Sequence, residues 1–327
     1  MLQEMKFSST AVAFGSCADR YVLGGYSSQK SFEEMLEAAK KVPHLEGIEL
    51  IGGWQLTEAN AQQVVKKVVD SGLKVSMIIP ELWSSAKWGR GSFAANDQKV
   101  RQDAIANVKK SMELAQESGC NLISPWFGQD GYDYCFQADY IKSWDRIVEG
   151  LINCADYLPE VKIAVEYKIK EPRTHCFIGS IGKAILLVKE VDRVNVGINL
   201  DIGHALEGYE NMAESVALLK RFDNKLFHLH LNDNYRLWDD DMIPGSVHTI
   251  ENLELLYWLN KIGYDGWYSL DVFPYREDGL RAVIEGIEWF KGLFRVLNRI
   301  GMDNIEKVIR EGDATKSLAL IRKGLLA

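Results

Sequence analysis

Acidic and imidazole side chains recur at one kind of position in the second half of this 327-residue chain, at or directly after the end of a short apolar run. These side chains are Glu166, Asp201, His204, His230 and Asp271. Carboxylate oxygens together with an imidazole nitrogen form a ligand set that Mg²⁺, Mn²⁺ and Co²⁺ accept. One such residue could be a satisfied structural group, but repetition over four successive runs favours a common metal site.

A second acidic feature, Asp239-Asp-Asp241, follows His230 closely in the sequence. By itself this pair is most often part of a solvated loop, because Asp is common in turns. Beside the first group, however, it can supply oxygen ligands to a second divalent cation. The sequence therefore predicts two divalent cations, Mn²⁺, Mg²⁺ or Co²⁺, at adjacent positions.

Strand periodicity indicates how the ligands divide between the two cations. Residues two apart in a strand point to the same face, so Glu166 shares a face with Lys168, and His228 shares one with His230. The first expected set takes one residue from each of four strand ends: Glu166, Asp201, His230 and Asp271. The second expected set is His204, Asp239 and Asp241, with Asp201 or Glu166 as a bridge. We expect His228 to support the site without binding metal.

Aromatic residues lie at or just beyond the same strand ends. Flat apolar rings in such places can stack on the C–H faces of a sugar and exclude water. The residues expected to bind substrate are Trp126, Phe273, Trp83 and Trp88. Each could instead be a core residue, and Trp126 and Phe273 are preferred because they directly follow strand residues.

Short apolar runs of strand type alternate with longer amphipathic stretches along the chain. The eight runs are Ala11–Ser16, Gly47–Ile51, Lys74–Pro80, Asn121–Trp126, Lys162–Lys168, Val194–Asp201, Leu226–Leu231 and Trp267–Phe273. Eight strand–helix units match a (β/α)8 TIM barrel, which needs roughly 250 residues and carries its chemistry at the carboxyl ends of the strands. We predict an α/β fold with such a barrel over residues 1–300 and a C-terminal helical tail over residues 301–327.

Composition and charge narrow the range of partners. The net charge of -8 disfavours nucleic acid, which needs clustered Lys and Arg, and favours a small molecule. Five cysteines without Cys-x-x-Cys spacing indicate neither a disulfide framework nor a zinc ribbon. The segment Met1–Lys6 contains Glu4 and lacks an apolar signal region, and no apolar run has membrane-spanning length, so we expect a cytoplasmic protein. Apolar positions at helical spacing in the tail predict a homodimer or homotetramer.

Taken in order, the second half of the chain resembles a known family. The segments are Glu166-Tyr-Lys-Ile-Lys-Glu-Pro172, Asp201-Ile-Gly-His204, His230-Leu-Asn-Asp233, Asp239-Asp-Asp241 and Asp271. They are similar to the xylose isomerase-like superfamily, and especially to its two-metal aldose–ketose isomerases of the L-rhamnose isomerase type. By this resemblance the first set would hold a structural metal, and the second set, joined by Asp201, would hold a catalytic one. Lys168 would contact substrate oxygens.

The resemblance implies an aldose–ketose isomerase that acts on a small unphosphorylated sugar by a 1,2-hydride shift, with Lys168 as a catalytic cation. The alternative is a single-metal sugar 3-epimerase, or another keto-sugar enzyme, that transfers protons through Glu166 and Asp271. Single-metal epimerases of the superfamily have a glutamate where this chain has Asp271, which reaches one methylene less far. The identity of the sugar stays open.

Overall fold

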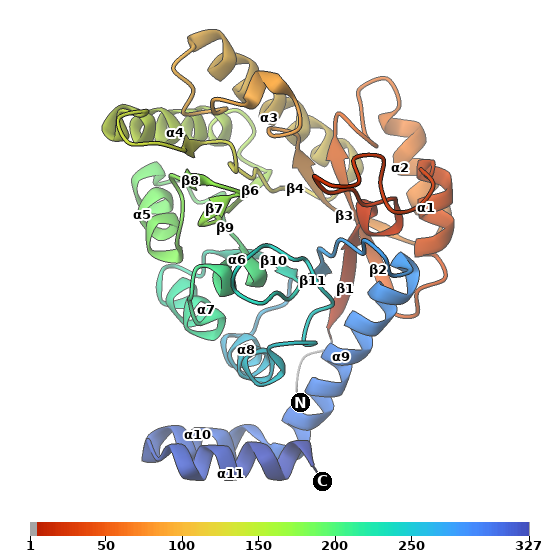
Figure 1. Ribbon diagram of the computed structural model, residues 1–327, viewed down its shortest axis with the longest axis vertical. Coiled ribbons are helices and arrows are strands. Elements are labelled where there is room, and N and C mark those ends of the chain that lie inside the picture. Colours follow the sequence, from red (N-terminus) through yellow and green to blue (C-terminus); the bar gives the residue numbers. More distant parts are fainter. Residues whose placement is uncertain (1–4, 327) are drawn as a thin grey trace.

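The computed structural model describes residues 5–326, which form a closed barrel of parallel strands (Figure 1). Neighbouring strands follow the order β1-β11-β10-β9-β6-β4-β3-β2 around the barrel. Their bounds are β1 Lys6–Thr10, β2 Leu45–Gly52, β3 Lys74–Pro80, β4 Leu122–Ile123, β6 Lys162–Glu166, β9 Val196–Asp201, β10 Leu226–Leu231 and β11 Trp267–Leu270. The predicted (β/α)8 barrel is confirmed.

Helices surround the strands, as Figure 1 shows. Their bounds are α1 Phe32–Ala39, α2 Ala61–Asp70, α3 Gln98–Ser118, α4 Tyr140–Ala155, α5 Ile181–Val191, α6 Ile202–Glu207, α7 Met212–Arg221, α8 Thr249–Ile262 and α9 Gly279–Ile300. Local capping fixes where several of them begin: Ser31 and Glu34 form a capping box at α1, and Asp278 caps α9. Apolar helix faces and the outer faces of the strands make one large hydrophobic core.

The first strand differs from the prediction. The run Ala11–Ser16 is not a strand: β1 is Lys6–Thr10, and Ala11–Phe14 form a short 3-10 helix. Ser8 and Ser9 are fully buried in β1, and the Ser9 hydroxyl donates to the Leu270 carbonyl at 3.1 Å. A strand with buried serines has no apolar run to mark it, whereas a buried helical turn does, and the two cannot be separated by hydrophobicity alone.

The inside of the barrel has a polar and an apolar side. A hydrogen-bonded group of buried side chains inside the barrel comes from β2, β9, β10 and β11: Glu49, Asn199, His228, His230 and Ser269. The apolar ones form a separate cluster of Ile51, Met77, Ile79, Leu122 and Ala164. The barrel therefore places hydrogen-bonding groups beneath one part of its mouth and packing groups beneath the other.

Two further elements lie outside the barrel. A small antiparallel sheet, in the order β5-β8-β7, is built from Gly131–Tyr132, Thr174–Cys176 and Lys170–Glu171. Beyond α9, the helices α10 Met302–Glu311 and α11 Ala314–Leu325 lie side by side, apart from the ring of helices in Figure 1. Gly324 of α11 packs on α9 so closely that an added Cβ would lie 2.4 Å from Ile300.

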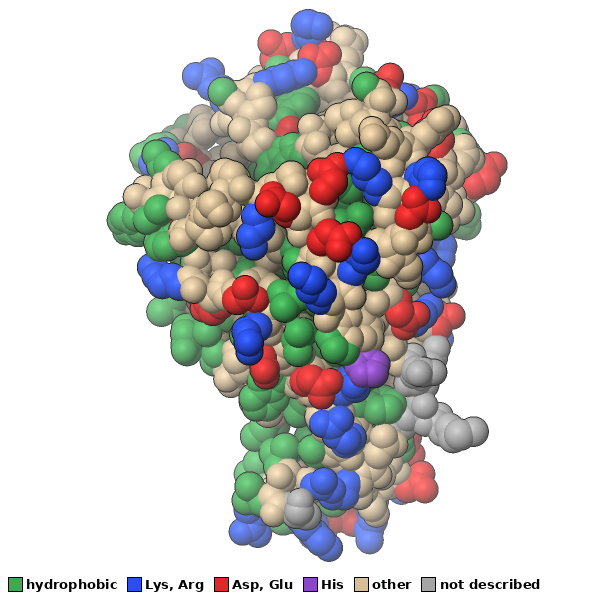
Figure 2. All heavy atoms as spheres, turned by 90° about the vertical axis from the view of Figure 1, so that its right-hand side faces the viewer, with side chains coloured by type: hydrophobic (Ala, Val, Ile, Leu, Met, Phe, Trp, Pro, Cys, Tyr) green, Lys and Arg blue, Asp and Glu red, His purple; other side chains and the backbone are tan. Residues whose placement is uncertain are grey.

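The surface carries charges of both signs. On the face in Figure 2, acidic and basic side chains are interspersed, with no large area of one sign. In the tail, Ile309 and Leu318 are 50% and 61% exposed. Within residues 5–326, no helix combines the length and apolar character that crossing a bilayer requires. Residues 1–4, part of the N-terminal segment considered above, and residue 327 of the tail lie outside the described residues.

Candidate metal centre

Four strand ends bring polar side chains together at one side of the barrel mouth. These are Glu166 and Asp201, the last residues of β6 and β9, His230 of β10, and Asp271 directly after β11. One ligand atom of each lies within 4.8 Å of one atom of every other. The Nδ1 atom of His230 is the centre of the group, at 3.5 Å from Glu166 Oε2, 3.7 Å from Asp201 Oδ2 and 3.3 Å from Asp271 Oδ2. The structure thus assembles the first predicted ligand set.

Buried polar groups hold Glu166 in this set. The Asn199 amide donates to Glu166 Oε2 at 2.9 Å, and the Ser124 hydroxyl lies 3.4 Å from the same oxygen. The Asn199 amide nitrogen is also 3.2 Å from His230 Nδ1. Sequence reasoning missed Asn199 and Ser124. For Asn199 the sequence did offer a signal, a polar residue inside a buried strand two positions before the ligand Asp201.

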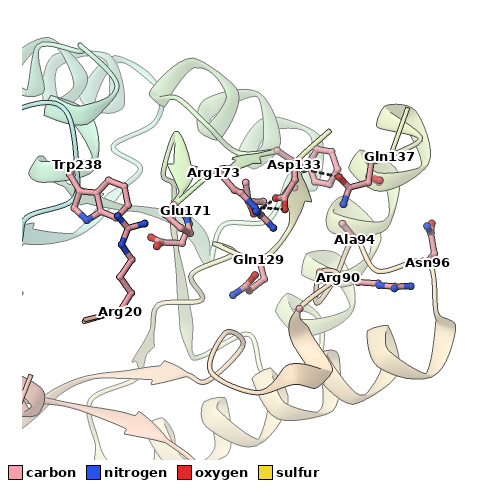
Figure 3. A pocket seen from close by; sticks show the side chains of 18 residues that line it. Arg20, Arg90, Ala94, Asn96, Gln129, Asp133, Gln137, Glu171, Arg173 and Trp238 are labelled. Carbon is pink, nitrogen blue, oxygen red and sulfur yellow. Dashed lines mark hydrogen bonds and ion pairs between the residues drawn. The ribbon is translucent and has the colours of Figure 1, made fainter. Parts of the chain in front are cut away.

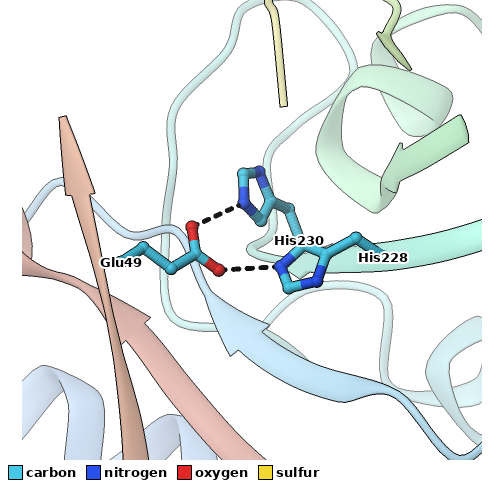
Figure 4. Close-up of side chains that lie close together, drawn as sticks. All are labelled: Glu49, His228 and His230. Atoms are coloured by element: carbon cyan, nitrogen blue, oxygen red, sulfur yellow. Dashed lines mark hydrogen bonds and ion pairs between the residues drawn. The ribbon is translucent and has the colours of Figure 1, made fainter. Parts of the chain in front are cut away.

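Glu49 of β2 lies beneath the ligand set and joins two histidines of β10 (Figure 4). Its Oε1 is 2.7 Å from His228 Nε2, and its Oε2 is 3.0 Å from His230 Nε2. The Ser269 hydroxyl also donates to Oε1. Burial would raise the pKa of Glu49, but the imidazoles of His230 and His228 hold that pKa well below its ordinary value. Sequence analysis missed Glu49, an isolated carboxylate in the apolar run of β2.

The spacing Asp201-Ile-Gly-His204 has a local structural cause. Asp201 caps α6, and its Oδ1 accepts the His204 backbone N–H at 2.9 Å, so the chain turns into a helix directly after the strand. His204 Nδ1 donates to the Tyr167 carbonyl at 2.9 Å, which leaves Nε2 facing Asp239 Oδ2 at 3.2 Å. Gly203 is required, because an added Cβ would lie 2.0 Å from Asn232 Oδ1.

Lys168 places a buried cation beside Asp239. Its Nζ lies 2.6 Å from Asp239 Oδ2, forms a second ion pair with Glu171, and stands 5.2 Å from the centre of the Trp126 ring. Burial would lower the pKa of Lys168, but Asp239 and Glu171 reverse this and hold it well above its ordinary value. Lys168 therefore stays protonated at neutral pH. Burial opposes the charged form of His204 too, but Asp201 and Asp239 overcome this effect and raise the pKa of His204 to about 10.

The loop between β10 and α8 carries Asp239 and Asp241. Asp233 holds this loop at its far end by accepting the backbone N–H groups of Val247 at 2.9 Å and His248 at 3.0 Å. The ring Nδ1 of His248 lies 2.7 Å from the same carboxylate. The segment His230-Leu-Asn-Asp233 therefore combines a ligand with the group that fixes the next loop.

Asp241 is linked to Asp201, one of the residues predicted to accompany it, through the amide of Asn232. Asp241 Oδ1 accepts from the Asn232 amide at 3.2 Å, and the same amide lies 3.0 Å from Asp201 Oδ2. Burial, then the carboxylates of Asp239 and Asp271, hold the pKa of Asp241 well above its ordinary value. Within residues 5–326 the second predicted set does not form a compact group like the first.

Aromatic side chains form a row that begins at Lys168. Trp126 lies under the Lys168 ammonium and meets Trp83 edge to face, with ring centres 5.5 Å apart. Trp54, which sequence analysis missed, continues the row at 5.8 Å from Trp83 and is 46% exposed. The row gives the mouth an apolar wall.

The other two predicted aromatics differ from each other. Phe273 lines the same pocket as Lys168 and Asp241. Trp88 is 4% exposed and belongs to the hydrophobic core, and its indole N–H donates to Glu81 at 3.1 Å. The expectation that Trp88 binds substrate is not supported, because its ring packs inward and its polar atom is already satisfied.

The mouth opens into a polar cleft of about 870 Å³ (Figure 3). In Figure 3, Arg20 and Trp238 lie at one end, Arg90 and Asn96 at the other, and the ion pair of Arg173 with Asp133 between them. The cleft adjoins the pocket of Lys168, and the residues that line both are Arg20, Glu171, Pro172 and Trp238. A substrate can therefore reach the mouth from this side.

The first ligand set fits a divalent cation. Three carboxylates surround one imidazole in a buried place, and such an excess of negative charge is costly unless a cation neutralises it. Burial raises the pKa of Asp271 to about 7, and the carboxylates of Glu166 and Asp201 add to this shift. Three oxygens and one nitrogen suit Mn²⁺, Mg²⁺ or Co²⁺.

A family model described as the xylose isomerase-like TIM barrel matches residues 30–311. The chain belongs to this family. The resemblance to the xylose isomerase-like superfamily, read from the segments around Glu166, Asp201 and His230, is thereby confirmed.

Solved structures of similar fold include three epimerases or epimerase-like proteins. A D-tagatose 3-epimerase-like protein has 21% identity and a TM-score of 0.69, with 90% of this chain and 99% of that chain covered. D-psicose 3-epimerase from Clostridium cellulolyticum H10 has 16% identity and a TM-score of 0.67, with 88% and 99% covered. An L-ribulose 3-epimerase has 14% identity and a TM-score of 0.70, with 91% and 98% covered. At these identities the likeness shows the fold.

Proposed function

We propose that this protein is a metal-dependent aldose–ketose isomerase that acts on a small unphosphorylated sugar. One divalent cation would be held by Glu166, Asp201, His230 and Asp271, and a second by Asp201, His204, Asp239 and Asp241. When bound, such cations act as Lewis acids that polarise the sugar carbonyl and stabilise an alkoxide at the neighbouring carbon. The net charge of -8 supports a small-molecule ligand over nucleic acid.

The observation that carries the proposal is the buried ammonium of Lys168. Asp239 at 2.6 Å and Glu171 hold it in place, and its raised pKa keeps it charged. A fixed cation in a site shielded from water stabilises negative charge that develops on a substrate oxygen. Because the ammonium carries no free electron pair, Lys168 serves as an electrostatic group and not as a base.

The placement of Glu166 favours a hydride shift over proton abstraction. Its Oε2 accepts from Asn199 and contacts Ser124, so this carboxylate is anchored as a ligand. In the proposed reaction the C2–H bond breaks and hydrogen moves to C1 with its electron pair. The O2 hydroxyl loses a proton and O1 gains one, so the atoms balance, and no acid–base pair on opposite faces of the sugar is needed.

A single-metal 3-epimerase is the second candidate, and Asp271 favours it. Asp271 directly follows β11 at the barrel mouth, and a carboxylate in this place can accept a proton from the sugar and return it. Glu166 would be its partner across the substrate. The compactness of the first ligand set, compared with the second, also suits a one-metal enzyme.

The test is a substrate screen of the Mn²⁺-loaded protein. Aldopentoses, aldohexoses, 6-deoxyaldohexoses and the corresponding ketoses are incubated separately, and the formation of ketose, aldose or a second ketose is followed by chromatography with an EDTA-treated sample as control. The proposal expects at least one aldose to give its ketose in a metal-dependent reaction, with two cations per chain by elemental analysis. Interconversion of two ketoses without aldose formation would contradict it in favour of the epimerase.

A further inference from the structure

The structure points to Glu49 as a positioning residue for the metal ligand His230, an inference that rests on the metal site of the proposed function. Glu49 is on β2, in the half of the chain where no ligand was predicted, whereas His230 is on β10. Two strands, β1 and β11, separate them around the barrel, so the contact crosses the interior. We propose that Glu49 fixes the protonation site and the ring orientation of His230.

The hydrogen bonds determine which ring nitrogen carries hydrogen. An ionised carboxylate accepts and does not donate, so His230 must present an N–H to Glu49 through Nε2 at 3.0 Å. A neutral imidazole then has a bare lone pair on Nδ1, the atom that faces the carboxylates of the ligand set. The amide of Asn199, 3.2 Å from Nδ1, fits the same assignment because an amide N–H is a donor.

The carboxylate of Glu49 is itself fixed by other donors. His228 Nε2 lies 2.7 Å from its second oxygen, and the Ser269 hydroxyl donates to that oxygen too. All four side chains are buried, with exposures of 1% or less. Nδ1 of His228 has no hydrogen-bond partner within the described residues. The ring of His228 therefore makes its hydrogen bond to Glu49, through Nε2.

The two histidines of the sequence His228-Leu-His230 have different roles in this arrangement. Strand period two directs His228 and His230 to the same inner face, with His228 one layer deeper. His230 would bind the cation through Nδ1, Glu49 would orient His230, and His228 would orient Glu49. A carboxylate behind a metal-bound histidine fixes its tautomer and raises its basicity, and loss of such a group typically costs about 10- to 100-fold in metal affinity or activity.

The experiment compares Mn²⁺ affinity, by isothermal titration calorimetry, in the wild type and three variants. Glu49→Gln should bind Mn²⁺ about 10- to 100-fold more weakly. The two histidines contact different oxygens of Glu49, and in Gln one of these is replaced by an NH₂ group that donates and does not accept. His228→Gln should lose less, since Glu49 keeps its bond to His230. The matched control is Asp130→Asn, which also removes a buried carboxylate but one that bonds Ser92 and Ala94, and its affinity should stay within about twofold.

A measurement on the wild type keeps the inference testable even if Glu49→Gln does not fold. In protein labelled with ¹⁵N-histidine and loaded with Mg²⁺, the spectra should show His230 protonated at Nε2 and not at Nδ1. Metal-bound His230 with hydrogen on Nδ1, or wild-type Mn²⁺ affinity in Glu49→Gln, would overturn the role of Glu49. A wild-type protein that binds no Mn²⁺ would overturn the proposed metal site together with it, so the two failures are distinguishable.

Discussion

Two groups of acidic residues meet at the barrel mouth, and they are built differently. In the first, Glu166, Asp201 and Asp271 come from strand ends and lie within 4.8 Å of His230 and of one another. In the second, Asp239 and Asp241 come from the loop between β10 and α8. Asp239 is paired with Lys168, and Asp241 is held by Asn232.

The difference shows how far the barrel itself determines a site. Hydrogen bonds between parallel strands fix the first group, and buried residues such as Glu49 and Asn199 support it from below. The second group depends on one loop conformation, in which Asp241 has a positive φ of 45° and Asp233 holds the loop end. We therefore expect the first group to bind metal without rearrangement, whereas the positions of the second group should change with the conformation of the loop.

The largest effect is expected from the residue shared by both groups. Asp201→Asn keeps a good helix cap for α6 but removes a charge from both proposed cation sites. Turnover should fall below detection, and Mn²⁺ affinity should drop at least as far as the about 10- to 100-fold that is typical when a residue behind a metal ligand is lost. Asp139→Asn, which changes a similar cap at α4, is the control. Titration calorimetry that shows unchanged affinity in Asp201→Asn would count against the assignment.

The loop-borne group can be removed alone. In the double variant Asp239→Asn and Asp241→Asn, we expect turnover to be abolished while one cation stays bound, because the strand-borne group is untouched. Elemental analysis of dialysed protein gives the count. Full activity in this variant would refute a catalytic role for the second group.

Lys168 links the two groups electrostatically. Lys168→Met keeps the unbranched shape of the side chain, shortened by the terminal atom, and loses its charge. The kcat should therefore fall about 10²- to 10³-fold, as for removal of one group that stabilises an oxyanion. Initial rates at saturating sugar measure this. The cation count should stay the same, and a loss of metal instead of kcat would show that Lys168 is structural.

Asp130, a buried carboxylate outside both groups, should make the stability of the protein depend on pH. Burial raises the pKa of Asp130 to about 6 from an ordinary 3.8, so between these values the folded state binds more protons than the unfolded state. The contribution of Asp130 to the free energy of unfolding is fully present below about pH 4. It decreases by about 3 kcal/mol as pH rises through 6. Urea unfolding with EDTA present should show this loss in the wild type relative to Asp130→Asn. Parallel pH profiles would contradict it.

The smallest effect on catalysis is expected far from the mouth. The exposed Ile309 and Leu318 of α10 and α11 suit burial against a second copy of the chain, as the predicted homodimer or homotetramer requires. The double variant Ile309→Glu and Leu318→Glu should have a lower mass by light scattering than the wild type, with little change in kcat. A monomeric wild type would contradict the expectation.

Sequence reasoning located the strand-borne residues because the ends of apolar runs mark the mouth of a barrel. It misplaced the first strand, since the buried serines of β1 give no apolar signal. It missed Glu49 and Asn199, because their hydrogen-bond partners lie on other strands, far away in the sequence. Such pairs are brought together by the fold and leave no local pattern in the sequence. Trp88 shows the same limit, because a residue beyond a strand end can still pack inward and bond Glu81.

The most direct test of the proposed hydride shift is to run the reaction in D₂O with the aldose found in the screen. The account predicts a ketose with little deuterium at C1, because hydrogen passes directly from C2 to C1. Mass spectrometry and NMR of the product measure this. Near-complete deuterium incorporation at C1 would contradict the hydride shift and indicate proton transfer through a carboxylate such as Asp271.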